Sequence, residues 1–460
     1  MSETIGTIAS GVWTPVLFLL ILGGLFFLFY SRFVPYKYFG HTIAILRGKY
    51  NNPNDPGQIN AYQALSTALA STVGMGNIAG VAAAIAIGGP GALFWMWIAA
   101  IVGMATNFFT SSLSVMYKGK DSAGEIQGGP MYVIREALGR PWYPLAVLFC
   151  LCAAIGCLPI FQANQLTQII IDIGITDQDI KRASFHVGNF EVNSAKFAIG
   201  CALMIISGIV IIGGIQRIGR WAGKMVPLMI VIYFLLVLTI LALNIGKVPS
   251  YLWMIFTDAF SANHYKGEPL LGGIVGGLIV AGVRRAAFSN EAGIGTAPMA
   301  LGASKSREPI REGLVSMLSP AIDTLLVCTL TALTILVTDV WRTTDANGVS
   351  LTVKAFESTL GGTGKILLLI SAFFFAITSL FSYSYYGNKA LSFLLGVKAG
   401  KYYNYFYLLT IIFGAILSMQ DIMNIIDIAY ALMAIPTMVS GFVLAPKVMK
   451  EARRYFSKLG

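Results

Sequence analysis

The chain has 460 residues, of which 56% are hydrophobic and only 12% are charged, and its mean hydropathy is +0.73. This proportion of apolar side chains exceeds what the core of a water-soluble domain can enclose, which excludes a soluble globular protein. The net charge of +11 does not indicate a nucleic-acid partner, because the basic residues gather in alternate loops. The sequence therefore predicts an integral membrane protein surrounded by lipid.

Polar breaks divide the chain into about eleven apolar segments, each near the ~20 residues that cross the hydrocarbon core as a helix. The first segment follows an acidic start and is too long for a cleavable signal, so we expect it to remain as an additional helix. The expected spans are residues 12–34, 61–87, 91–117, 143–172, 196–215, 222–246, 270–304, 311–338, 364–388, 403–419 and 421–445.

The basic residues predict the orientation. Of the 32 Lys and Arg, 22 lie in alternate loops and in the C-terminal tail, whereas the opposite loops, with the starts of the fifth and ninth spans, carry eight. Cytoplasmic loops are enriched in positive charge. We therefore expect a multi-pass cell-membrane protein with its N-terminus outside and a basic tail, residues 446–460, in the cytoplasm.

The sequence contains no pattern typical of an enzyme or of a metal centre. The three histidines lie in loops without an H-E-x-x-H motif, and no G-x-S-x-G motif is present. All five cysteines fall inside expected spans, which indicates buried thiols and not disulfides or zinc ligands. We expect neither catalysis nor a bound cofactor.

Two expected spans contain glycines where a helix should continue. Span 61–87 holds T-V-G-M-G-N from Thr72 to Asn77, and span 270–304 holds E-A-G-I-G-T from Glu291 to Thr296. Glycine is ~1 kcal/mol worse than alanine inside a helix. The motifs lie five spans apart, so the two segments cross the membrane in opposite senses, as in transporters built from inverted repeats.

A helix can open at mid-membrane only where a ligand, an ion or water satisfies the freed backbone. The positive ends of half-helices suit a carboxylate, and the freed carbonyls suit an ammonium group or Na⁺. Close helix packing through the Gly76 and Gly80 spacing is the alternative interpretation. A dinucleotide fingerprint is excluded because no strand precedes the glycines.

Three stretches resemble the alanine or glycine:cation symporters. They are G-G-P-G-A-L-F-W-M-W-I-A-A-I-V-G from Gly88 to Gly103, F-S-N-E-A-G-I-G-T-A-P from Phe288 to Pro298, and R-E-P-I-R-E-G from Arg307 to Gly313. The resemblance extends over spans 2 to 11. It implies an all-α polytopic fold of the bacterial leucine-transporter type, with a five-plus-five inverted repeat, two broken helices and one extra N-terminal helix.

The implied organisation is an extra helix and loop in residues 1–60, a first repeat in 61–246 and a second in 247–445. In such transporters the two broken helices clasp an amino acid, which assigns spans 2 and 7 to the binding site. One chain is sufficient for this mechanism, and the sequence does not determine the oligomeric state.

The resemblance to the leucine-transporter type also implies a sodium site between spans 2 and 9, because the run F-F-A-I-T-S ends at Ser379. Its oxygens would be the carbonyls of Ala70, Val73 and Phe375 with the hydroxyls of Thr378 and Ser379. The alternative for the two hydroxyls is a hydrogen bond to their own helix.

The same resemblance implies a substrate site at the two breaks. Amides would bind the carboxylate, carbonyls would receive the ammonium group, Asn77 would hold the opened turn or touch the ligand, and apolar side chains would form walls. The candidate residues are Thr72, Gly74, Met75, Gly76, Asn77, Gln162, Gln165, Phe288, Ser289, Gly293 and Ile294. For Gln162 and Gln165, hydrogen bonding within the helix packing is the alternative.

Some relatives of the leucine-transporter type have uncharged residues around a second sodium site. Spans 7 and 8 of this chain instead contain the charged residues Arg284, Arg285, Glu291 and Asp323. Because charges at this depth are costly unless paired, we expect Arg284 or Arg285 to meet Glu291 or Asp323, leaving one sodium site. The alternative is that Glu291 or Asp323 carries a proton. The predicted function is sodium-coupled import of alanine or glycine by alternating access. A proton-coupled carrier, a carrier of another small amine and, less favoured, a channel remain alternatives.

Overall fold

The computed structural model describes residues 2–50, 52, 54–175, 178–187, 190–267, 273–417 and 419–459. The first three residues of the expected span 270–304 lie outside this range. Helices dominate the described part of the chain, and two short antiparallel hairpins complete it.

The N-terminal part begins with the additional helix and continues through the first broken span. Its elements are α1 (Ser2–Tyr30), α2 (Val34–Lys37), α3 (Phe39–Leu46), α4 (Ala61–Thr72), the π-helical η1 (Gly76–Gly80), α5 (Val81–Gly88), α6 (Gly91–Met116), β1 (Gly119–Lys120), β2 (Ile126–Gln127), α7 (Pro130–Val133), η2 (Ile134–Leu138), η3 (Arg140–Trp142), α8 (Tyr143–Gly156), α9 (Ile160–Ile169), η4 (Ile170–Gly174), α10 (Gln178–Arg182), β3 (Ser184–Val187), β4 (Phe190–Asn193), α11 (Ser194–Ile211) and α12 (Gly214–Leu243).

The C-terminal part contains the second broken span and the longest helix. Its elements are α13 (Val248–Ser261), α14 (Gly273–Asn290), α15 (Thr296–Leu301), α16 (Pro309–Ser316), α17 (Leu318–Pro320), η5 (Ala321–Cys328), α18 (Thr329–Val337), α19 (Val340–Thr343), α20 (Val349–Leu395), α21 (Val397–Ile416) and α22 (Met419–Phe456).

The first break lies at the predicted glycines. Helix α4 starts with a capping box, in which the Asn60 side chain and the Gln63 side chain each bond the other residue's backbone amide. It stops at Thr72, and the chain resumes as η1 and α5 with a bend of 48° between the two halves. An interrupted helix at this position confirms the prediction.

The second break lies between α14 and α15 and has a different backbone. Glu291, Gly293 and Gly295 all have positive φ angles, of 54°, 82° and 113°. Glycine adopts this region without the penalty that a Cβ imposes. Here the glycines allow a left-handed turn, whereas neither Gly74 nor Gly76 is among the positive-φ residues. The prediction of two broken helices is therefore confirmed, with two different local causes.

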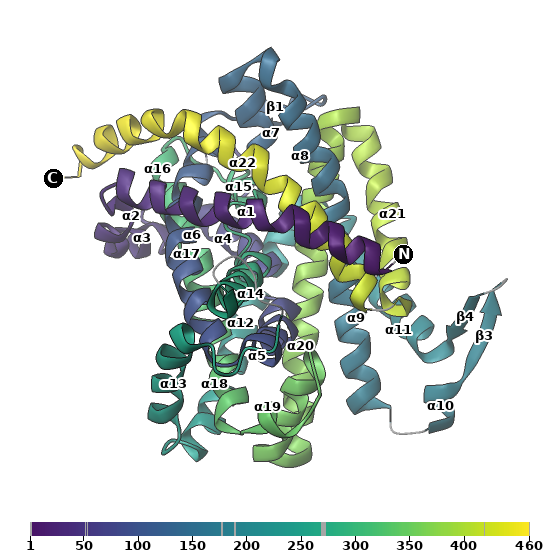
Figure 1. Cartoon of the computed structure of the whole chain (residues 1–460). Helices are drawn as coiled ribbons and strands as arrows, with labels where there is room; N and C mark the ends of the chain where they lie inside the picture. Colours follow the sequence, from purple (N-terminus) through teal and green to yellow (C-terminus); the bar gives the residue numbers. More distant parts are fainter. Residues whose placement is uncertain are drawn as a thin grey trace.

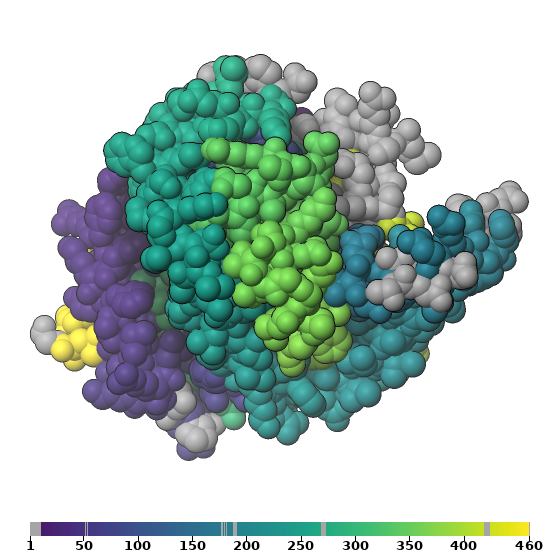
Figure 2. Space-filling view, turned by 90° about the horizontal axis from the view of Figure 1, so that it is seen from below, coloured from purple at the N-terminus to yellow at the C-terminus, as the bar shows by residue number. Residues whose placement is uncertain are grey.

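The helices form one bundle in which α1 and α22 lie side by side and α20 crosses the body (Figure 1). The hairpin β1–β2 and α7 lie at one end of this bundle, and α13 and α19 lie at the other (Figure 1). Figure 2 looks onto the end with α13 and α19 and shows the blue-green segment with β3 and β4 projecting from one side. The two breaks lie inside the body, where Gly76 and Ile294 are buried.

The number of spans differs from the expectation of eleven. Among the described residues, eight helices are long and apolar enough to cross a membrane, or nine if the bent pair α4 and η1–α5 is one span. Expected span 364–388 is only the later part of α20, which also includes residues before a kink at Gly361. Polar residues of its first part, such as Glu357, concealed this helix in the hydropathy pattern.

Candidate substrate and cation site

The first break is held open by a side chain that captures a backbone amide. The Gly74 amide donates to Asn77 Oδ1 at 2.8 Å, and the Asn77 amide donates to the Gly74 carbonyl at 3.1 Å. In a continuous helix these two amides would bond the carbonyls of Ala70 and Val73, four residues earlier. Both carbonyls proposed as sodium ligands therefore lose their usual helical donors.

The next amide of the break also turns away from its own helix. Met75 N donates to Gln162 Oε1 of α9 at 3.0 Å. Gln162 is thus placed at the break, as predicted. Gln165 is not, because its amide nitrogen bonds Asn164 Oδ1 at 3.1 Å, and Asn164 in turn bonds the carbonyls of Gly414 and Leu417. For Gln165 the packing alternative agrees with the structure.

Gly74 allows α20 to approach the break closely. A methyl group placed on Gly74 would lie 2.4 Å from Ser379 Oγ, far inside van der Waals contact. Gly76 lacks this constraint, since a methyl group there would lie 3.7 Å from the nearest atom, Ser289 Cα. The structure therefore brings Ser379 to the first break, where the sodium site is proposed.

The hydroxyls of the proposed sodium site bond their own helix in this structure. Thr378 Oγ1 donates to the carbonyls of Phe374 and Phe375 at 2.9 and 3.1 Å, and Ser379 Oγ donates to Phe375 O at 2.9 Å. A hydroxyl that donates to a carbonyl keeps lone pairs for a cation. The geometry is thus compatible with both interpretations of these residues.

The second break uses an asparagine in the same way. The Ala292 amide donates to Asn290 Oδ1 at 3.0 Å, so the carbonyl of Phe288 loses its helical donor. Asn290 Nδ2 donates to Thr324 Oγ1 at 3.0 Å, which fixes the side chain. Sequence reasoning missed Asn290, although asparagine commonly bonds the backbone amide two residues on.

A buried carboxylate joins the two breaks. Asp323, on η5, accepts hydrogen bonds from Asn77 Nδ2 at 2.6 Å, Ser289 Oγ at 2.9 Å and Thr324 Oγ1 at 2.7 Å. Asn77 belongs to the first break and Ser289 to the end of α14 before the second. Cys328 lies 3.3 Å from both Asn77 Nδ2 and Ser289 Oγ. Asp323 therefore links both breaks to η5 through hydrogen bonds.

The expected ion pairs differ from those in the structure. Arg284 pairs with Asp427 of α22, and within the described residues no cation forms a salt bridge with Glu291 or Asp323. Glu291 Oε1 instead accepts bonds from the hydroxyls of Tyr383 and Tyr430, while Oε2 has no partner in the described structure. The sequence interpretation was wrong about the partner because Asp427 is far away along the chain and lies on the last helix.

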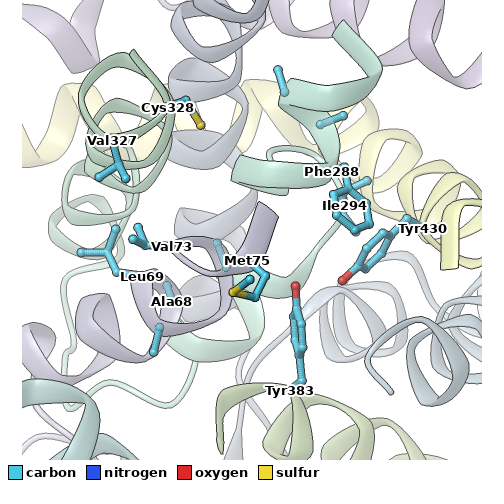
Figure 3. Packing of buried hydrophobic residues seen from close by; sticks show 14 of the residues in the cluster. Ala68, Leu69, Val73, Met75, Phe288, Ile294, Val327, Cys328, Tyr383 and Tyr430 are labelled. Atoms are coloured by element: carbon cyan, nitrogen blue, oxygen red, sulfur yellow. The ribbon is translucent and has the colours of Figure 1, made fainter. Parts of the chain in front are cut away.

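Apolar side chains converge on the two breaks from three elements. Phe288 packs edge-on against Phe161 of α9 and Tyr430 of α22, with ring centroids 5.1 and 5.7 Å apart. Figure 3 shows Met75, Phe288, Ile294 and Tyr430 gathered in this region. The described residues of both breaks are buried, so the region is closed to bulk solvent.

The remaining predicted residues lie beside the same region. Thr72 Oγ1 bonds the Ala68 carbonyl at 3.2 Å and lies 3.4 Å from Ser319 Oγ. Gly293 packs toward α1, because a methyl group on it would lie 2.6 Å from a methyl carbon of Leu20. Arg285 lines a cavity with Arg284 and Trp13.

Two interrupted helices that share a buried hydrogen-bond partner, Asp323, are typical of membrane transporters built from inverted repeats. Comparisons with known proteins agree. The transporter MhsT, solved in complex with L-phenylalanine, has a TM-score of 0.62 at 14% identity, covering 85% of this chain and 89% of its own. This likeness shows the fold, which is of the leucine-transporter type.

The profile of the sodium:alanine symporter family matches residues 1–460, and the chain belongs to this family. The sodium/alanine symporter AgcS of Methanococcus maripaludis is 35% identical, with 98% of this chain and 96% of the relative covered. The probable sodium/glutamine symporter GlnT of Bacillus subtilis is 31% identical over 99% of this chain and 91% of its own. The chain is a multi-pass, cation-coupled amino acid symporter and not an enzyme.

Proposed function

We propose that this symporter imports alanine and glycine together with one sodium ion, and that the two breaks form the binding site. The observation that carries the proposal is the loss of helical donors at the carbonyls of Ala70, Val73 and Phe288. Freed carbonyls in a buried region need a partner, and a cation or an ammonium group is a partner that a transporter can supply from its ligands. The family and the relative AgcS support sodium and alanine as the particular ligands.

The sodium ion would lie between the first break and α20. Its ligands would be the carbonyls of Ala70, Val73 and Phe375 and the hydroxyls of Thr378 and Ser379. These are neutral oxygens, which suit a hard cation. The proximity of Ser379 Oγ to Gly74 supports this arrangement.

The amino acid would lie beside the sodium ion. Its carboxylate would accept hydrogen bonds from the amides of Gly74, Met75 and Gly76, of which those of Gly74 and Met75 now bond Asn77 Oδ1 and Gln162 Oε1. Gln162 would offer its side-chain amide to the ligand as a hydrogen-bond partner. Carbonyls at Thr72, Phe288 and Ser289 would receive the ammonium group. Phe288 and Ile294 would limit side-chain size, although one methylene changes binding by only ~1–3 kcal/mol through contact alone.

A second candidate is coupling to protons. It is favoured by Glu291, whose buried carboxylate has no basic partner and whose Oε2 has no hydrogen-bond partner in the described structure. A neutral carboxyl group would cost far less there than a charged one. In this version Glu291 or Asp323 takes up the proton and no sodium ion is needed.

Uptake of alanine into proteoliposomes distinguishes sodium coupling from proton coupling. Purified protein would be supplied with labelled alanine under an inward sodium gradient, an inward proton gradient, or potassium alone. We expect accumulation only with sodium, competition by glycine and a sodium-to-substrate ratio of one. Accumulation with a proton gradient alone would show that the coupling ion is a proton, carried by Glu291 or Asp323, and not sodium. Uptake that does not saturate with alanine concentration would indicate a channel.

The proposed orientation places the N-terminus outside and the basic tail in the cytoplasm. The end of the bundle with β1, β2 and α7 would then face the cytoplasm, because its loops hold Lys118, Lys120 and Arg135. Labelling of single cysteines introduced at Lys120 and at Thr257, on intact cells with an impermeant reagent, tests this orientation. We expect reaction at position 257 and protection at position 120.

A further inference from the structure

A cavity lies outside the two breaks, at the end of the bundle with β1, β2 and α7. It has a volume of about 240 Å³ and is lined by residues of the hairpin, the end of α20 and the segment before α4. Pockets for drug-sized ligands measure roughly 300–1,000 Å³. This cavity therefore suits a molecule of only a few heavy atoms.

The cavity contains a buried cation without a carboxylate partner in the described structure. Lys389 of α20 is 3% exposed, and its ammonium group donates to Met299 O at 3.0 Å and bonds Tyr385 OH at 2.8 Å. No described carboxylate lies within salt-bridge distance of it. An ammonium group has three protons, so one remains for an anionic ligand.

The same cavity contains two buried acceptors without donors. Oε1 of Gln58 and Oε1 of Gln127 are both buried, and neither has a hydrogen-bond partner in the described structure. Buried acceptors left unpaired cost about 1–3 kcal/mol each. Both oxygens would be satisfied by a ligand that donates hydrogen bonds.

The orientation of Gln127 is fixed by the hairpin. Its Nε2 donates to Asp121 Oδ2 at 3.1 Å, while Asp121 Oδ1 accepts the amides of Ala123 and Glu125 at 2.9 and 3.0 Å. The side-chain nitrogen of Gln127 is thus engaged in a hydrogen bond, and its Oε1 remains available to accept one. Asp121 and Glu125 also line the cavity and add negative charge opposite Lys389.

We propose that this cavity is a second amino-acid site, in which Lys389 binds the carboxylate and Gln58, Gln127 and Asp121 surround the ammonium group. A small zwitterion is the ligand that has both an anionic end for the buried cation and a donor end for the two acceptors. A simple anion would leave the oxygens of Gln58 and Gln127 without a hydrogen-bond donor. A simple cation would leave Lys389 without a negatively charged partner. The site is separate from the two breaks and does not use the sodium ligands.

The position of the cavity connects it to both broken spans. Met299, whose carbonyl accepts a hydrogen bond from Lys389, belongs to α15. Gln58 lies shortly before α4, and its backbone amide donates to the Ala303 carbonyl at 2.8 Å. A carboxylate bound to the remaining proton of Lys389 would weaken the hydrogen bond from Lys389 to Met299 and so the contact between α20 and α15. With the proposed orientation, cytoplasmic amino acid would then act on the second broken span and slow further import.

The test is equilibrium binding of labelled alanine to the purified full-length protein, with sodium or with choline in its place. Because the inference rests on the proposed function, Asn77→Ala serves to remove the site at the breaks. We expect two alanine molecules per wild-type chain with sodium and one with choline, and the choline-resistant molecule should remain in Asn77→Ala.

The variants Lys389→Met and Gln127→Leu should each lose the choline-resistant alanine, at least tenfold in affinity. Lys401→Met, which removes an exposed lysine of α21 near the same end, is the matched control and should keep it. If Lys389→Met does not give a monodisperse protein, Gln127→Leu decides, since this change removes the unbonded oxygen and only one internal hydrogen bond, from Nε2 to Asp121.

The outcomes separate the two proposals. A single sodium-dependent alanine that is lost in Asn77→Ala and kept in Lys389→Met and Gln127→Leu overturns the second site and leaves the proposed function intact. Choline-resistant binding without any sodium-dependent binding supports the second site and overturns the proposed function. No alanine binding in either salt overturns both.

Discussion

Replacing Asn77 by alanine tests the idea that a side chain keeps the first helix open. The Asn77 side chain accepts the Gly74 amide at 2.8 Å and donates to Asp323 Oδ1 at 2.6 Å. A buried hydrogen bond contributes about 0.5–1.5 kcal/mol, and one to a charged group about 1.5–3 kcal/mol. We therefore expect the free energy of unfolding to fall by roughly 1.5–4.5 kcal/mol. The lower value is the loss of the bond to Asp323 alone, with the Gly74 amide bonded again within its helix, and the upper value is the loss of both bonds.

The functional effect should be larger than the loss of stability. Without Asn77 the Gly74 amide can return to the Ala70 carbonyl, because that is its partner in a continuous helix. The carbonyl would then no longer bind sodium. We expect Asn77→Ala to abolish sodium-driven alanine uptake and to remove the increase in melting temperature that sodium gives to the wild type.

The matched control is Asn244→Ala at the end of α12, whose side chain donates one bond to its own helix, to Ile240 O at 3.0 Å. This variant should keep wild-type uptake. Melting of both variants in detergent, with sodium or choline, checks that they fold. Wild-type sodium dependence of uptake in Asn77→Ala would refute the role of this side chain in opening the helix.

Four more substitutions test the site and helix α3, which contains His41. Gly74→Ala should lower the melting temperature and the sodium affinity, because its methyl group would meet Ser379 Oγ. The melting temperature of Gly76→Ala should stay near that of the wild type. Melting curves with and without sodium test both expectations. Thr378→Val should raise the sodium concentration for half-maximal uptake at least tenfold while the protein stays folded, and an unchanged value would remove this hydroxyl from the sodium site. Burial, with the charges of Arg311 and Lys49, lowers the pKa of His41, so its protonation opposes the folded state, and the melting temperature should fall as pH drops through the ordinary pKa near 6.5. His41→Gln should flatten that pH dependence, which melting curves between pH 7.5 and 5 would show.

The sequence predicted the positions of the breaks because a pair of glycines weakens a helix wherever it lies inside an apolar span. Asn77 was a candidate because it belongs to the glycine motif. Gln162 and Gln165 were proposed together, and only packing shows that Gln162 bonds the Met75 amide whereas Gln165 bonds Asn164. The pairing of Arg284 with Asp427 was not predictable, because the two residues are 143 positions apart and only the packing of α22 brings them together. The bond from the Ala292 amide to Asn290 was not predicted. At this position the sequence indicated roles only for the neighbouring residues, Ser289 and the charged Glu291.

The two asparagine contacts have a consequence for the free energy of ligand binding. Because Asn77 and Asn290 bond the diverted amides, contacts within the protein themselves stabilise the interrupted backbone. Unwinding the helices does not have to be driven by the amino acid or the cation, so more of their interaction energy remains as affinity. A protein that binds a ligand as small as alanine benefits particularly from such preorganisation, since so few atoms are available to supply that energy.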